Sequence, residues 1–174
     1  LALVLERIAA NGIRRFWILD APHDMGVIFR NARWAKAAGI EDIMVALSYS
    51  ISPVHTDEYY AQKASQIAEC PDVDAVYLKD QGGLLTPERV KTLVPIIQQN
   101  IKGLPLEIHS HCNTGLAPLC YLEAARLGVR TFHTAVPTLA NGSSLPSIEN
   151  TLNNLGRSGF TSNIDRVVLA EMAV

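Results

Sequence analysis

The chain has 174 residues, of which 48% are hydrophobic and 18% are charged, and its formal net charge is −2. This composition indicates a globular protein of about one domain, and the absence of lysine- or arginine-rich blocks argues against a nucleic-acid partner. No apolar run reaches the roughly 18 residues that cross a bilayer, and the start lacks a signal-peptide pattern, so we expect a cytoplasmic protein without a membrane segment.

The cysteines and the first residue bear on the context of the chain. Cys70, Cys112 and Cys120 form no CxxC pair and are odd in number, which favours reduced thiols over a disulfide framework. The first residue is Leu1 rather than methionine, and it precedes a sequence typical of a helix already in progress. We therefore expect the chain to be a fragment.

Short β-rich apolar runs alternate with longer segments of helical periodicity from Arg14 onward. The predicted strands are residues 14–20, 42–50, 74–79, 104–111 and 130–136. The predicted helices are residues 27–39, 56–70, 86–100, 115–128 and 147–156. This alternation is typical of βα units and a parallel sheet.

Local chemistry supports several helix boundaries. Hydroxyl residues with a glutamate in the following turn are predicted to be N-caps, namely Thr56, Thr86 and Ser147. Glycines, which adopt the left-handed C′ conformation without a Cβ penalty, are predicted to end helices at Gly39, Gly128 and Gly156. Pro95 is predicted to kink or shorten its helix.

Five βα units leave two main architectures, a closed eight-stranded barrel and an open doubly wound sheet. The strand-to-helix turns contain neither GxGxxG nor GxxxxGK[ST], so dinucleotide and P-loop phosphate chemistry are not indicated. Five units are too few for a complete barrel. If the start is truncated, three further units are expected upstream.

His109 and His111 are two residues apart in a predicted strand, so they share one face with Cα atoms roughly 6.6 Å apart. Two imidazoles placed in this way can bind one divalent metal ion, and they suit zinc, manganese or cobalt better than calcium. The H-x-H pattern alone leaves open a pair of hydrogen-bonded core histidines.

Lys79 ends the preceding predicted strand, at the end that matches the histidines. A lysine ammonium cannot bind a cation, but a neutral amine can react with carbon dioxide to give a carbamate with two ligand oxygens. Burial and a nearby metal would both lower the amine pKa and favour that reaction. The alternative is a surface ion pair between Lys79 and Asp80. Together, Lys79 and the two histidines favour a metal site.

Other polar residues have simpler interpretations. His133 could form a hydrogen bond with a metal ligand, but we favour a polar residue at a strand end. His23 and Asp24 could line the mouth of a barrel or simply lie in a loop, and His55 is expected in a loop or at a helix start. Cys112 should point away from the histidine face as a packed thiol.

Four segments carry a resemblance to a known family: "YSISPVHTDEYY", "LKDQGGLLTPE", "IHSHCNTG" and "HTAVPTLANGSSLPS". They resemble the carboxyltransferase domain of biotin-dependent enzymes that act on pyruvate or oxaloacetate. Those enzymes include pyruvate carboxylase, the oxaloacetate decarboxylase alpha subunit and the transcarboxylase 5S subunit. They lie within a wider barrel group that also holds 3-hydroxy-3-methylglutaryl-CoA lyase and isopropylmalate synthase.

The resemblance implies that residues 1–174 form part of a carboxyltransferase TIM (β/α)8 barrel, covering about its last five βα units. It implies a divalent metal bound by carboxylated Lys79, by His109 and His111, and by an aspartate from a strand that these residues do not include. Lys79 would then serve catalysis as a metal ligand.

The implied reaction is carboxyl transfer between carboxybiotin and a 2-oxo acid through a metal-stabilised enolate. Biotin would be attached to a carrier domain or subunit, with a biotin carboxylase as a further partner, in a homo-oligomer. No Met-Lys biotinylation motif occurs in these residues.

Two alternatives remain open. A lyase or synthase that uses acyl-CoA and a 2-oxo acid would keep the H-x-H pair but would make Lys79 a structural residue. A non-catalytic partial barrel would keep the metal residues without a complete site. Lys79 favours biotin chemistry, because the aldol-type relatives lack the carboxylated lysine.

Overall fold

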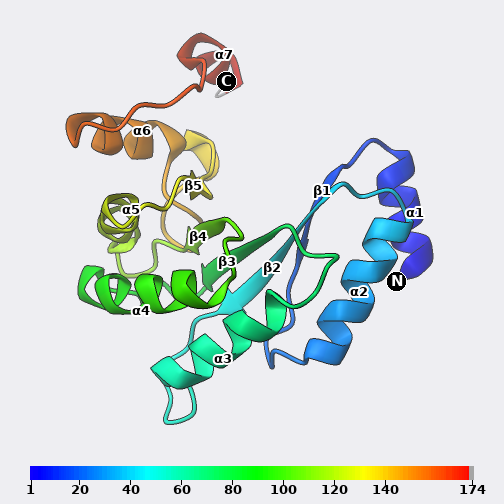
Figure 1. Ribbon diagram of the computed structural model, residues 1–174. Coiled ribbons are helices and arrows are strands. Elements are labelled where there is room, and N and C mark those ends of the chain that lie inside the picture. The colour runs from blue at the N-terminus through cyan, green and yellow to red at the C-terminus, as the bar shows by residue number, and fades with distance from the viewer. Residues whose placement is uncertain (173–174) are drawn as a thin grey trace.

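The computed structural model describes residues 1–172; residues 173–174, the end of the predicted domain 1–174, lie outside the described residues. One parallel sheet contains β1 (Arg15–Ile18), β2 (Asp42–Ser48), β3 (Ala75–Asp80), β4 (Leu106–Ser110) and β5 (Thr131–Phe132). The strands lie side by side in the order of the chain, β1-β2-β3-β4-β5 (Figure 1). The predicted α/β fold with a parallel sheet is confirmed.

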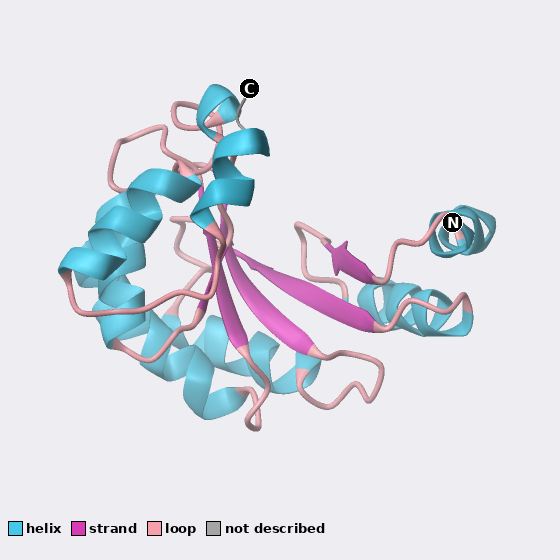
Figure 2. Cartoon of the chain, turned by 90° about the horizontal axis from the view of Figure 1, so that it is seen from above, coloured by secondary structure: helices cyan, strands magenta, loops and turns pink. Residues whose placement is uncertain are grey.

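Helices follow each strand, and a further helix precedes the first. They are α1 (Ala2–Ala10), α2 (Met25–Ala37), α3 (Asp57–Ile67), α4 (Pro87–Asn100), α5 (Ala117–Arg126), α6 (Ile148–Arg157) and α7 (Arg166–Met172), with the 3₁₀ turn η1 (Pro137–Leu139). Each strand lies beside the one before it, and the strand order never reverses. Because βαβ crossovers are right-handed, the connecting helices then lie on one face of the sheet (Figure 2). A doubly wound sheet requires such a reversal, and the described residues have none.

The two faces of the sheet have different partners. Alternate residues such as Val45, Leu47 and Leu78 join one large buried cluster with helix residues such as Ile28 and Tyr60. The opposite face carries a smaller buried cluster of Met44, Ala46, Ala75 and Tyr77. We call this second side the inner face, because the helices do not cover it (Figure 2).

The predicted N-caps are confirmed. The side chains of Thr56, Thr86 and Ser147 each accept a hydrogen bond from the backbone N–H three residues later. Gly39 and Gly128 follow helix ends with φ of 93° and 95°, as predicted. The prediction that Gly156 ends a helix is wrong, because Gly156 lies inside α6. Gly159, with φ of 85°, adopts the left-handed conformation beyond that helix instead.

The predicted shortening of one helix and the predicted length of one strand differ from the structure. Helix α4 runs from Pro87 to Asn100 with Pro95 inside it, so the proline does not shorten the helix. Lys91, whose carbonyl loses its N–H partner there, is exposed and can bond to water. Strand β5 has only two residues instead of the predicted seven, because after His133 donates its N–H to Ile108 the chain turns toward Pro137 and η1.

Candidate functional site

The predicted site residues lie on the inner face at the carboxyl ends of two neighbouring strands. Lys79 of β3 pairs in register with His109 of β4, and Ser48 of β2 pairs with Lys79 on the other side. His111 follows two residues after His109 on the same face. The side chain of His109 is buried, whereas those of Lys79 and His111 are half-buried.

The two histidines converge through the same ring atom. Nε2 of His109 lies 3.1 Å from Nε2 of His111. The other ring nitrogen of His111, Nδ1, lies 2.7 Å from the backbone carbonyl of Ser143. A carbonyl can only accept, so His111 carries its proton on Nδ1 and presents the lone pair of Nε2.

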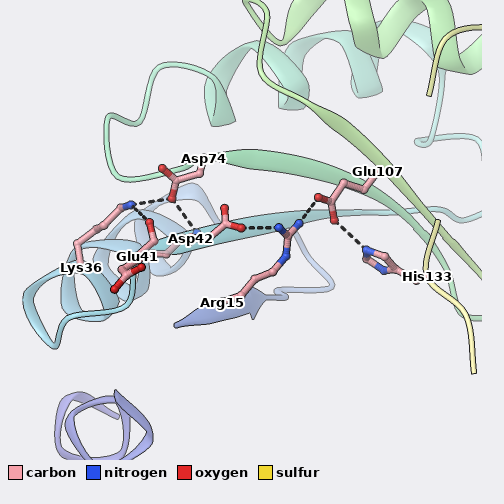
Figure 3. A network of polar contacts seen from close by, with 8 residues as sticks. Arg15, Lys36, Glu41, Asp42, Asp74, Glu107 and His133 are labelled. Atoms are coloured by element: carbon pink, nitrogen blue, oxygen red, sulfur yellow. Dashed lines mark hydrogen bonds and ion pairs between the residues drawn. The ribbon is translucent and has the colours of Figure 1, made fainter. Parts of the chain in front are cut away.

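A polar chain extends from His109 deeper along the inner face. Nδ1 of His109 lies 3.1 Å from Nδ1 of His133, and Nε2 of His133 lies 2.8 Å from Oε2 of Glu107. Arg15 of β1 makes ion pairs with both Glu107 and Asp42 (Figure 3). Burial alone would raise the pKa of Glu107, but hydrogen bonds from His133 and Arg15 lower it below its ordinary value.

The surroundings keep His109 neutral. Burial, together with the neighbouring His133, Lys79 and His111, lowers the pKa of His109 to about 3. Burial also lowers the pKa of the Lys79 amine. Neutral imidazole is the form that binds a metal, and a lowered amine pKa is the condition for carbamate formation.

The amine of Lys79 points to Gln81, just beyond the end of β3, rather than to the histidines. Its Nζ lies 3.2 Å from Oε1 of Gln81, to which it donates. Within residues 1–172, no group of three or more His, Cys, Asp or Glu side chains is arranged to hold a metal ion. The structure therefore brings His109 and His111 together and places Lys79 beside them on the adjoining strand.

The alternative of a surface ion pair between Lys79 and Asp80 is wrong. Asp80 is fully buried, and its carboxylate accepts hydrogen bonds from the backbone N–H groups of Leu84 and Leu85 and from the hydroxyl of Ser110. Successive strand residues point to opposite faces, so Asp80 anchors the loop after β3 while Lys79 faces inward.

The remaining candidates have structural roles. His23 is buried and accepts a hydrogen bond from Ser48 N–H, and Asp24 is the N-cap of α2. His55 lies just before α3, as expected, and contacts Ser52. All three cysteines are free, as predicted, and all three are buried, as expected for Cys112. No helix among the described residues has the length and apolarity to span a bilayer.

Four participants went unnoticed in the sequence: Arg15, Trp17, Glu107 and the carbonyl of Ser143. Glu107 had a detectable signal, because it precedes His109 by two residues and so shares its face. The ring of Trp17 stacks on that of His133 with centroids 4.4 Å apart, a contact between β1 and the residue after β5. No local pattern could have predicted that contact or the Ser143 carbonyl.

The chain is homologous to carboxylases and carboxyltransferases, which confirms the resemblance seen in its sequence motifs. It is 35% identical over 162 residues to a pyruvate carboxylase subunit of Methanocaldococcus jannaschii, covering 93% of this chain and 28% of that protein. It is 32% identical over 170 residues to the 2-oxoglutarate carboxylase large subunit of Hydrogenobacter thermophilus, covering 97% and 26%. The Propionibacterium freudenreichii methylmalonyl-CoA carboxyltransferase 5S subunit is 28% identical over 162 residues, with 92% and 32% covered.

A comparison of the fold with solved structures gives a similar result. The carboxyl transferase domain of Rhizobium etli pyruvate carboxylase, solved with pyruvate, matches with a TM-score of 0.89 and 21% identity, covering 99% of this chain and 30% of that one. No protein-family model matches the chain. The chain spans about a third or less of the length of these relatives.

Proposed function

We propose that the chain contributes to a site for carboxyl transfer between carboxybiotin and a 2-oxo acid such as pyruvate or oxaloacetate, through the enolate of the keto acid. The observation that carries this proposal is the convergence of His109 Nε2 and His111 Nε2 at 3.1 Å, beside Lys79 on the adjoining strand. Homology to a pyruvate carboxylase subunit and a methylmalonyl-CoA carboxyltransferase subunit supports it.

The proposed architecture is a TIM (β/α)8 barrel of which residues 1–174 supply about the last five βα units. Sequential parallel strands with the helices on one face support it, since closing such a sheet would turn the inner face into a barrel interior. The site then lies at the carboxyl ends of the strands, where active sites of this fold occur.

The histidines fit a divalent metal ion. Two nitrogens each about 2.1 Å from a common ion lie roughly 3.0 to 3.4 Å apart at ordinary coordination angles, which matches the 3.1 Å between the two Nε2 atoms. The Nδ1–H of His111 is held by a backbone carbonyl, as in many metal-binding histidines. When bound, zinc, manganese or cobalt would polarise the keto-acid carbonyl as a Lewis acid.

Lys79 is proposed as a third ligand in its carbamate form. Its neutral Nζ would attack carbon dioxide, forming an N–C bond and releasing one proton, and the product carries one negative charge. The lowered pKa of Lys79 favours the neutral amine that this step requires. Lys79 pairs with His109 in the register, so a carbamate on Lys79 that turned away from Gln81 would lie on the same face as the histidines.

The proposed partners follow from the relatives. Several of them are named as subunits, which supports a biotin carrier and a biotin carboxylase on other domains or chains. Homo-oligomerisation and a cytoplasmic location remain predictions from the sequence.

Replacing both metal-binding histidines tests the proposal. The variant His109→Ala with His111→Ala, made in the full-length protein, should lose bound metal and carboxyl exchange together, because both nitrogen ligands are gone. Metal analysis and isotope exchange from carboxybiotin to pyruvate measure the two effects. The variant His55→Ala removes a histidine outside the site and should change neither. Full metal occupancy in the double variant would contradict the assignment.

A lyase or aldolase function is the second candidate. The chain is 25% identical over 169 residues to 4-hydroxy-2-oxovalerate aldolase of Geobacillus stearothermophilus, covering 97% of this chain and 48% of that protein. In that case Lys79 would keep a free amine and act structurally. High-resolution density at Lys79 separates a carbamate from an amine and therefore separates the two candidates.

A further inference from the structure

We infer that His133 and Glu107 are positioning residues that fix the proton of His109 on Nδ1 and so direct its Nε2 lone pair at the same point as that of His111. This inference rests on the proposed function, because it assumes that His109 and His111 bind a metal. It assigns a role to two buried residues that the metal site itself does not use.

The proton positions follow from the contacts, starting at the carboxylate. Glu107 is paired with the guanidinium of Arg15, so it is an acceptor only. His133 Nε2, 2.8 Å away, therefore donates to Glu107, and a His133 that carries this proton alone keeps a lone pair on Nδ1. His109 Nδ1, 3.1 Å from that atom, then donates its N–H to His133.

The consequence appears at the other side of the His109 ring. With its proton on Nδ1, His109 presents a lone pair at Nε2, and His111 presents another, since its Nδ1–H donates to the Ser143 carbonyl. Two lone pairs that face each other at 3.1 Å repel unless a cation lies between them. The hydrogen-bond chain thus favours the His109 tautomer that a cation at this point requires, which lowers the cost of ordering the ligands.

Packing holds the positioning residues in place. His133 and Glu107 are 7% and 2% exposed, so water does not compete for their hydrogen bonds. The Trp17 ring of β1 stacks on the His133 ring with centroids 4.4 Å apart and an interplanar angle of 13°. Arg15, also on β1, makes an ion pair with Glu107. Strand β1 therefore supports the orientation of a ligand on β4, and Figure 3 shows Arg15 of β1 bound to Glu107, which in turn contacts His133.

Zinc binding to the full-length protein, measured by calorimetry, tests the inference. His133→Phe keeps a ring for Trp17 but removes the acceptor, so His109 can adopt either tautomer, and zinc affinity should fall about 10- to 100-fold. His133→Asn restores a side-chain acceptor near the position of Nδ1 and should recover most of the affinity. Glu107→Gln, whose amide can also donate to His133, should weaken binding in the same direction. His55→Phe is the matched control and should bind zinc like the unchanged protein.

A spectroscopic measurement checks the proton assignment independently of substitution. In the zinc-loaded protein with ¹⁵N-labelled histidine, His109 Nδ1 should be protonated and His133 Nδ1 unprotonated, with a scalar coupling between them across the shared proton. A proton on His133 Nδ1, or unchanged zinc affinity in His133→Phe, overturns the inference. If the His109→Ala, His111→Ala variant also keeps its zinc, the proposed metal site itself fails, so the two failures are distinguishable.

Discussion

At the scale of single residues, His23 shows how a buried histidine can be essential to the fold without belonging to the site. Its Nε2 accepts the N–H of Ser48 at 2.8 Å, and its Nδ1 contacts the hydroxyl of Tyr59 at 2.7 Å. The Ser48 N–H needs the unprotonated Nε2, so the fold selects neutral His23. Burial, helped by Lys63 and His55 and opposed by Asp20, lowers the pKa of His23 to about 4.

This depressed pKa predicts an acid-sensitive fold. The unfolded chain binds a proton at His23 near pH 6.5, before the folded chain does, so the stabilisation is complete above pH 6.5 and is lost as the pH falls toward 4. The loss is on the order of 3 kcal/mol in full. His23→Gln offers a non-titrating acceptor to the Ser48 N–H, so the free energy of unfolding should depend less on pH between 6.5 and 4. Chemical denaturation of the full-length protein between pH 8 and 4.5 measures it, and equal slopes for both proteins would contradict the prediction.

The sequence predicted individual site residues only where a local rule applied. Alternation along one strand placed His109 and His111 on one face, and matching strand ends placed Lys79 beside them. His133 follows the end of β5, in line with the favoured interpretation, but it is also buried between His109 and Glu107. Its burial depends on Trp17, which is more than a hundred residues away in the chain, so no local pattern could reveal it.

At the scale of elements, the loops after β3 and β4 are joined by close backbone contacts. Thr114 donates its hydroxyl to the carbonyl of Gly83 at 2.6 Å, and Asn113 donates its side-chain amide to the carbonyl of Gln81. Gly83 has φ of 65°, and a Cβ there would lie 2.8 Å from the backbone oxygen of His111. The glycine thus lets the loop that follows Lys79 approach the backbone of a proposed ligand.

Gly83→Ala should therefore destabilise the protein by about 1 to 3 kcal/mol, from the left-handed backbone and the steric overlap together. Gly82→Ala is a matched control, because a Cβ at Gly82 would lie 2.9 Å from Cγ of Leu84, an exposed side chain that can move aside, and the backbone has no positive φ. Denaturant titration of both variants measures the difference in the free energy of unfolding. Equal losses would contradict the role assigned to Gly83.

Element boundaries were predictable where a few adjacent residues decide them. The caps Thr56, Thr86 and Ser147 act on amides three residues away, so their chemistry is visible in sequence. The shortness of β5, in contrast, depends on the strand and segment beside it. β5 ends where its pairing with β4 ends, and the chain then bonds to the segment before α6, at Ala135 and Ser147.

At the scale of the whole molecule, the sheet has one covered face and one open face. Sequential strand order could be expected from five repeated βα units, but the spatial order was needed to exclude a doubly wound sheet. Within the described residues, β1 and β5 pair on one side only. Apolar side chains remain exposed on and beside these ends, including Trp17 at 45%, Leu3 at 65% and Val4 at 53%.

Residues 1–174 expressed alone should therefore self-associate. Unpaired strand edges present backbone donors and acceptors to other chains, and exposed apolar patches favour burial between copies. Sedimentation velocity over a range of concentrations should show species larger than the monomer. Leu3→Glu with Val4→Glu places charges on α1 and should reduce association, whereas Ile51→Glu, an exposed loop position away from α1, should change it less. A concentration-independent monomer with a sharp cooperative melt would show that the segment completes its own surface, which contradicts the proposed partial barrel.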